Sequence, residues 1–176
     1  MNLTKLKFIG AAALVLLSTG LQADETDLRL FYSYELNGGD YISSIGTGVA
    51  YWQGDSNLGF QLNTSIGQAS ILADDGYIEE YVSWEGAVKF GYFSDISVYV
   101  EGGVDLAEIL FHDLRYDDYD EEFGYQDDID AYVGVGIGFK AGLLQVDGFI
   151  RAREIDSKYW EAESVTFTGM QVSINF

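Results

Sequence analysis

The residues best suited to chemistry are nine charged side chains that recur at alternate positions along the chain. They are Arg29, Glu35, Glu85, Lys89, Glu101, Asp105, Asp147, Arg151 and Arg153. Paired carboxylates can serve as general acid and base. Here both signs of charge share one side of each stretch, with glycine, serine and glutamine between them, so opposite charges would pair. The sequence therefore predicts an ion-pair network and no catalytic residue.

A second candidate is the acidic segment "FHDLRYDDYDEEFGYQDDID", residues 111–130. Asp118, Asp120 and Glu122 alternate as oxygen ligands do in a calcium loop, but Phe123 stands where such a loop needs glycine. Most charge runs are solvated, so we expect a loop and treat these three residues as a weak metal candidate only. Tyrosines within it would suit contact with a partner. They are Tyr116, Tyr119 and Tyr125.

His112 is the only histidine of the chain. A histidine can act as general base for a serine hydroxyl. No serine lies near His112 in sequence, and Ser70, Ser157 or Ser164 would reach it only through the fold. An ordinary loop histidine is the favoured interpretation.

The first residues predict export. Lys5 and Lys7 precede an apolar run, residues 8–17, and small residues end at Ala23, which is typical of a secretory signal peptide. Residues 1–23 are therefore expected to be cleaved, leaving one domain, residues 24–176. A net charge of −20 argues against a nucleic-acid partner, and the absence of cysteine excludes disulfides. No cofactor is indicated.

The elements that must position the charged residues are predicted to be strands. Apolar and polar residues alternate with period two in eight stretches, and the chain contains no proline. The expected strands are residues 28–36, 41–52, 58–67, 77–93, 97–110, 130–140, 143–153 and 166–176. Connections after the second, fourth and sixth are tight, and those after the third, fifth and seventh are longer. Short turns on one side and longer loops on the other are typical of a membrane barrel.

A soluble barrel would hide its apolar face inside, whereas a membrane barrel turns that face to lipid. Aromatic residues at the strand ends favour the membrane. One girdle is expected at the turn ends, comprising Tyr51, Phe60, Tyr92, Phe139 and Phe176. A second is expected at the loop ends, comprising Tyr34, Tyr41, Trp84 and Phe167. The predicted fold class is all-β: an eight-stranded antiparallel up-and-down transmembrane β-barrel.

Hairpin turns predict which residues face one another. The turn "NGGD" places Phe31 beside Gly46 and Arg29 beside Gly48, so large inward side chains meet glycine. The turn "SDI" places Lys89 opposite Glu101. A two-residue turn at Ala141 and Gly142 would place Asp130 opposite Arg153 and Tyr132 opposite Arg151.

The chain ends "TFTGMQVSINF". Gly169, Val172, Ile174 and Phe176 match a C-terminal pattern of small eight-stranded outer-membrane barrels, and the whole chain resembles that family, which includes the membrane domain of outer membrane protein A, the opacity proteins and porin-like proteins. The resemblance implies a monomer in the outer membrane of a Gram-negative bacterium. It also implies that these four residues are read by the barrel assembly machinery, and that the partners include membrane lipids and lipopolysaccharide.

Three functions stay open. The leading hypothesis is a non-enzymatic structural or surface-interaction protein whose acidic loops contact an extracellular partner or bridge to lipopolysaccharide through cations. The second is a narrow, gated, porin-like channel. The third is a lipid-A-modifying acyl enzyme that uses His112.

Overall fold

The structure, a computed structural model, describes residues 25–52, 56–72, 78–107, 109–110, 130–157 and 160–176. Alternating side chains and the absence of proline let each expected stretch form a strand. The eight strands are β1 (Glu25–Asn37), β2 (Asp40–Trp52), β3 (Leu58–Leu72), β4 (Ile78–Tyr92), β5 (Ile96–Asp105), β6 (Ala131–Ala141), β7 (Leu144–Ser157) and β8 (Trp160–Asn175).

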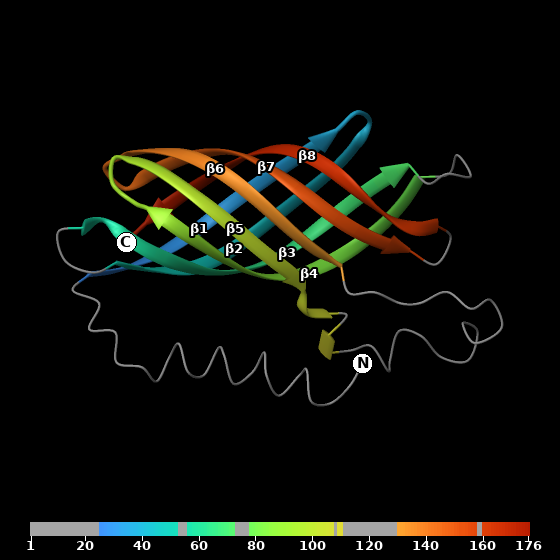
Figure 1. The fold of residues 1–176 in the computed structure, drawn as a ribbon, viewed down its shortest axis with the longest axis horizontal. Helices are drawn as coiled ribbons and strands as arrows, with labels where there is room; N and C mark the ends of the chain where they lie inside the picture. The colour runs from blue at the N-terminus through green and yellow to red at the C-terminus, as the bar shows by residue number, and fades with distance from the viewer. Residues whose placement is uncertain (1–24, 53–55, 73–77, 108, 111–129, 158–159) are drawn as a thin grey trace.

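The strands form one closed barrel in chain order (Figure 1). Every neighbouring pair is antiparallel, and β8 closes the barrel by pairing with β1. The closure extends to the end of the chain, since the Phe176 amide donates to the Leu28 carbonyl at 2.8 Å and the Leu28 amide donates back at 3.2 Å. The predicted eight-stranded antiparallel barrel is confirmed.

The two ends of the barrel differ in their connections. We call the end that carries the β2–β3, β4–β5 and β6–β7 connections and the C-terminus the turn side, on the left of Figure 1. The opposite end is the loop side. The β1–β2 hairpin lies there and turns through Gly38, whose φ of 59° suits glycine.

Two of the predicted registers are confirmed. Phe31 pairs with Gly46 and Arg29 with Gly48. Lys89 pairs with Glu101.

The predicted β6–β7 register is wrong by two residues. Gly142 and Leu143 form the turn, with φ of 63° at Gly142, so Ala141 remains in the ladder and pairs with Leu144. As a consequence Arg153 faces Tyr132 rather than Asp130, and Arg151 faces Gly134 rather than Tyr132. A shift of two residues keeps each side chain on its predicted face, because side chains alternate with period two.

Several strand ends differ from the prediction, and β3 is one of them, since it runs to Leu72. β5 stops at Asp105, because its Oδ1 accepts a 2.7 Å hydrogen bond from the Ala107 amide and the chain becomes helical at Leu106. The final hairpin is longer than predicted: β7 runs to Ser157 and β8 begins at Trp160, with a register shift near Ile155. The predicted loop between these strands is therefore too long. Ladder hydrogen bonds use the backbone, so the acidic side chains of this segment do not prevent strand pairing.

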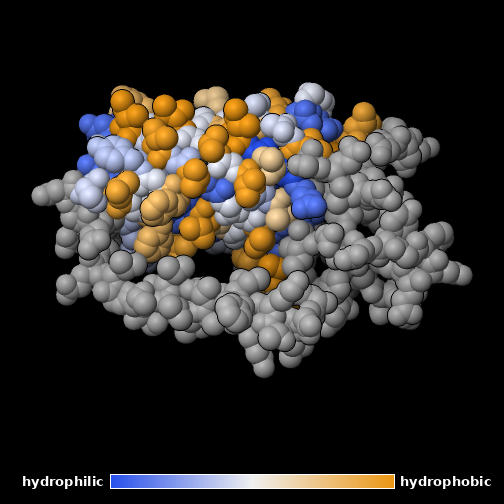
Figure 2. Space-filling model, viewed as in Figure 1, coloured by the Kyte–Doolittle hydropathy of each residue, from blue (hydrophilic) through white to orange (hydrophobic). Residues whose placement is uncertain are grey.

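The two faces of the sheet differ sharply in character. Apolar side chains gather over the strands on the face seen in Figure 2, and Ile45, Val133 and Phe139 are each more than 60% exposed. The inner face is buried and mostly polar. Among the described residues, no helix is long and apolar enough to cross a membrane.

Candidate functional site

The site is the interior of the barrel, where the nine predicted charged residues come together. Their exposed fractions run from 0% for Asp147 to 7% for Glu85, and all nine lie inside. They come from β1, β4, β5 and β7, which places charges around the whole inner wall.

Six of these residues form one continuous chain of contacts, which we call the central network. In order, they are Lys89, Glu101, Arg151, Glu35, Arg153 and Glu85. Its members alternate in charge, so each internal member touches two partners of opposite sign. The network spans the interior from β4 and β5 through β7 to β1.

The arginines provide the strongest contacts in the central network. Arg151 donates from Nε and Nη2 to both carboxylate oxygens of Glu101, at 2.8 and 2.9 Å, and from Nη1 to Glu35. Arg153 donates to Glu35 at 2.8 and 2.7 Å and to Glu85 at 2.7 Å. Two-pronged bonds of this kind fix geometry as well as charge, which is why arginine suits buried pairs.

Lys89 is held less tightly. Its Nζ lies 3.8 Å from Glu101 and donates to the Tyr99 hydroxyl at 3.2 Å and to Gln171 at 3.3 Å. A lysine with three polar partners is satisfied without a short ion pair.

A separate pair lies nearer the turn side. Arg29 is 3.5 Å from Asp147 and also donates to Gln61 and, at 2.5 Å, to Ser173. Gln145 donates to the other oxygen of Asp147 at 2.8 Å. Asp105 lies at the loop-side end of β5, where it pairs with Glu85 in the ladder and its Oδ1 accepts a hydrogen bond from the Ala107 amide.

Aromatic rings and glycines let these large side chains fit. The Arg151 guanidinium lies 4.1 Å from the Phe149 ring centre and 4.4 Å from that of Tyr132, and the Lys89 ammonium lies 4.3 Å from that of Tyr99. Such cation–π contacts replace part of the lost hydration. Each ring in turn lies against a glycine. A Cβ added at Gly103 would come within 2.5 Å of Tyr132.

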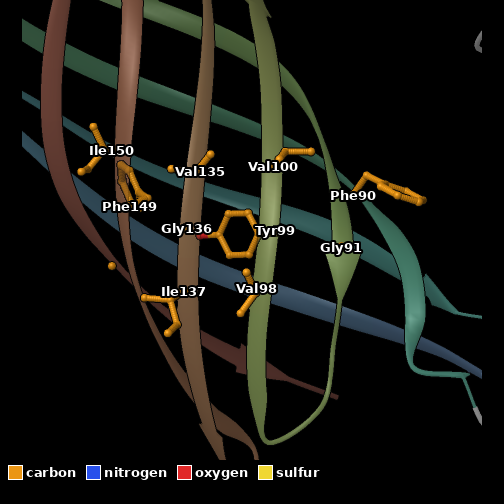
Figure 3. A pocket seen from close by; sticks show the side chains of 11 residues that line it. Phe90, Gly91, Val98, Tyr99, Val100, Val135, Gly136, Ile137, Phe149 and Ile150 are labelled. Carbon is orange, nitrogen blue, oxygen red and sulfur yellow. The ribbon is translucent and has the colours of Figure 1, made fainter.

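Tyr99 illustrates the arrangement in Figure 3, where its ring overlies Gly136. Its neighbours on the strand, Val98 and Val100, are more than half exposed on the outer face. The outer surface at this point carries a shallow apolar depression of about 670 Å³. It is lined by Phe90, Val98, Val100, Val135, Ile137 and Ile150 among others.

An apolar cluster that the sequence did not predict fills part of the interior near the loop side. Ile42, Ala69, Ile71 and Phe167 are each at most 5% exposed and pack together, with Val165 against them. We call these five residues the apolar cap. Phe167 was expected in the outer loop-side girdle, and that prediction is wrong. It has the same parity as the inward Gln171 and Ser173, and the sheet period therefore turns it inside.

The other expected girdle residues lie on the outer face. At the turn side, Tyr51 stacks on Phe60 with ring centres 5.0 Å apart, and Tyr92, Phe139 and Phe176 are 43%, 61% and 64% exposed. At the loop side Tyr34 stacks on Tyr41 at 6.0 Å. Trp84 lies near the middle of β4, where its indole nitrogen donates to the Thr64 hydroxyl at 2.9 Å.

Several candidates fall outside the described residues. These are the signal peptide (residues 1–23), His112, the calcium candidate (Asp118, Asp120 and Glu122) and the loop tyrosines (Tyr116, Tyr119 and Tyr125). Within the part of the chain that the structure describes, no group of three or more metal-ligating side chains is arranged to hold an ion.

The C-terminal residues occupy defined places. Val172 and Ile174 face outward and Phe176 follows them. Gly169 faces inward beneath Phe149, where an added Cβ would come within 2.5 Å of the ring. The structure thus supplies a packing reason for Gly169 that is independent of assembly.

Sequence reasoning placed Gln61, Gln171 and Ser173 on the polar face, and all three bond to the charged residues. It missed two inward residues. Tyr99 accepts a hydrogen bond from Lys89 at 3.2 Å, and Lys140 on β6 pairs with Asp27 on β1 at 3.0 Å across the turn-side mouth. Parity alone would have found Lys140, since it continues the inward series of Tyr132, Gly134 and Gly136.

An apolar outer wall around a buried, ion-paired interior defines the class: an eight-stranded transmembrane β-barrel of the outer-membrane kind. No sequence-family profile matches the chain, and no curated protein does.

Among solved structures the chain is similar to small outer-membrane barrels. Neisserial surface protein A is 10% identical, with 86% of this chain and 96% of that one covered and a TM-score of 0.47. The N-terminal barrel domain of OprF from Pseudomonas aeruginosa is 15% identical, with 86% of this chain and 96% of that one covered and a TM-score of 0.43. Ail from Yersinia pestis is 11% identical, with 86% of this chain and 100% of that one covered and a TM-score of 0.43.

Proposed function

We propose that this protein is a non-enzymatic outer-membrane barrel whose interior is closed, and that it serves as a scaffold presenting its acidic loop segments at the cell surface. The apolar outer wall supports the membrane location. The composition of residues 111–130 supports a surface that contacts a partner or bridges to lipopolysaccharide through cations.

The observation that carries the proposal is the central network. It commits six ionisable side chains to one another across the lumen, with Arg151 bonded to both Glu35 and Glu101. Groups held in this way are occupied as hydrogen-bond partners and are not poised for proton transfer. Eight strands leave space for side chains and little else, so the network also blocks the lumen.

Planar-bilayer recording of the purified, folded protein tests the closed interior. We expect no conductance steps from the wild type. Glu101→Gln retains the shape of the side chain but removes its charge, and the apolar cap should keep this variant closed as well. Regular single-channel steps from the wild type would contradict the proposal.

A narrow gated channel is the second candidate. The observation in its favour is the loose Lys89–Glu101 contact at 3.8 Å, beside an otherwise tight set of pairs. If this pair were a gate, Lys89→Ala would raise the open probability while Arg29→Ala, outside the central network, would not. If neither variant showed conductance steps, the gated-channel function would be excluded.

A further inference from the structure

The turn-side third of the interior holds a cavity that the proposed function leaves unused. Its volume is about 200 Å³. Polar side chains line most of it, among them Asn57, Gln61, Ser97, Gln145 and Asn175. The Asp27–Lys140 pair lies at its mouth, about one-third exposed, which shows that the mouth meets solvent.

Just inward of this cavity, the hydrogen-bonding capacity of buried polar atoms is not filled. Arg29 Nε makes no hydrogen bond, and the neighbouring Asp147 Oδ2 makes none either, although it lies 3.5 Å from Arg29 in an ion pair. Arg29 bonds to Gln61 and Asp147 to Gln145, and both glutamines line the cavity. Buried polar groups in proteins are almost always satisfied, and where no protein atom serves, an ordered water does. The cavity and its floor are therefore wet.

Space ends abruptly beyond this floor. The cavity lined by Ala87, Lys89 and Gln171 measures only about 10 Å³, and the one lined by Ser83 and Arg153 is of the same size. A volume of about 10–15 Å³ admits a single water at most. Neither space is large enough to carry water onward from the turn-side cavity, whose mouth lies at the Asp27–Lys140 pair.

The charges of the wet region are unequal. Carboxylates of Asp27, Asp95 and Asp147 meet the cations Lys140 and Arg29. The net charge of this region is therefore negative. The surrounding wall has a low dielectric constant, which strengthens the effect of this charge on an entering ion.

We propose that the turn-side cavity is a dead-ended half-channel that admits water and small cations from the turn side and stops at the central network. It rests on the proposed function, because a dead end requires a closed interior. A cation entering it would meet amide and carboxylate oxygens, which are the ligands that hard cations take.

Single cysteines test this directly, because the chain contains none. Ala50 lines the cavity and Ala87 lines the small central space, so Ala50→Cys and Ala87→Cys form a matched pair that removes no ion pair. Ser94→Cys, exposed at the rim, is the open reference. Each folded variant in lipid nanodiscs is treated with a cationic or an anionic methanethiosulfonate, and adduct formation is followed by mass spectrometry.

We expect Ala50→Cys to react at a rate near that of Ser94→Cys, and Ala87→Cys on the order of 100-fold more slowly, since it must await local opening. Solvent exposure alone predicts the reverse, because Ala50 is 3% exposed and Ala87 falls in a higher exposure class. The ratio of cationic to anionic rates at Ala50→Cys should exceed that of free cysteine severalfold.

Protection of Ala50→Cys equal to that of Ala87→Cys would overturn the half-channel, and so would a cationic preference no greater than that of free cysteine. Rapid reaction at Ala87→Cys would overturn the dead end. The fold of every variant is checked first by its mobility on a gel without heating. A wild type that fails that check contradicts the proposed function itself, whatever the labelling shows.

Discussion

The two faces of β7 show how differently the inside and the outside of this barrel are built. Asp147, Arg151 and Arg153 point inward and are 0–6% exposed, while Ile150 between them points outward and is 50% exposed. In a soluble barrel the apolar residues of such a strand would be inside. Here the buried face carries the charges, which is stable only if the charges pair with one another and lipid covers the outer face.

The comparison also separates two kinds of stabilisation. On the inside, specific partners matter, because an unpaired buried charge is costly. On the outside, only polarity and depth matter, because a lipid chain accepts any apolar side chain. The loss of stability caused by a substitution should therefore depend on the partners of the residue on the inside, and on its depth in the membrane on the outside.

Removal of Phe176 should have the largest effect, because it affects both faces at the barrel seam. Its backbone bonds to Leu28 close the barrel, and its side chain lies outside at the turn-side interface. We expect deletion of Phe176 to reduce the amount in the outer membrane more than deletion of residues 116–125. Quantitative blotting of membrane fractions measures this, and normal levels of the Phe176 deletion would count against the account.

Arg153→Ala should destabilise the barrel by about 3–5 kcal/mol, because it leaves Glu35 and Glu85 with fewer partners in a buried site. Urea unfolding in lipid vesicles, followed by fluorescence, gives the change. Glu154→Ala alters the exposed neighbour and should stay within about 0.5 kcal/mol. Similar losses from both variants would mean that position, not pairing, governs the interior.

Val135→Arg tests the outer face near mid-strand. Val135 is 55% exposed and pairs with Val100 and Ile150, well within the apolar wall. We expect a loss of about 2–4 kcal/mol, against about 0–1 for Phe139→Arg near the interface. The same unfolding assay applies, and equal effects at the two depths would argue against a membrane around this wall.

Gly169→Ala should cost about 1–3 kcal/mol, because the new methyl group overlaps the Phe149 ring. Phe149→Leu in the same chain should recover part of that loss, and a double-mutant cycle measures the coupling. Additive effects would show that the packing of Phe149 is not what requires glycine.

Much of this arrangement could be predicted from the sequence because side chains in a strand alternate with period two. Inside and outside assignments were correct for all nine charged residues, and even the wrong β6–β7 register preserved them. Partners were harder, since moving the two-residue turn by one position, from 141–142 to 142–143, moves every opposing pair by two.

The apolar cap was missed for a related reason. Phe167 was assigned to the outer face by its hydrophobicity, and Ile42 and Ile71 were assigned to neither face, although the parity of all three residues places them inside. The network contacts between β1 and β7 also lay beyond prediction, because β8 separates these strands and their side chains meet over its inner face.

Gel mobility without heating, after detergent extraction of outer membranes, tests the central claim of a lipid-facing wall around a closed, ion-paired interior. Folded membrane barrels resist SDS, so the account predicts a protein that stays with the membrane fraction and whose band shifts only on boiling. Recovery in the aqueous fraction, with one mobility before and after boiling, would contradict it.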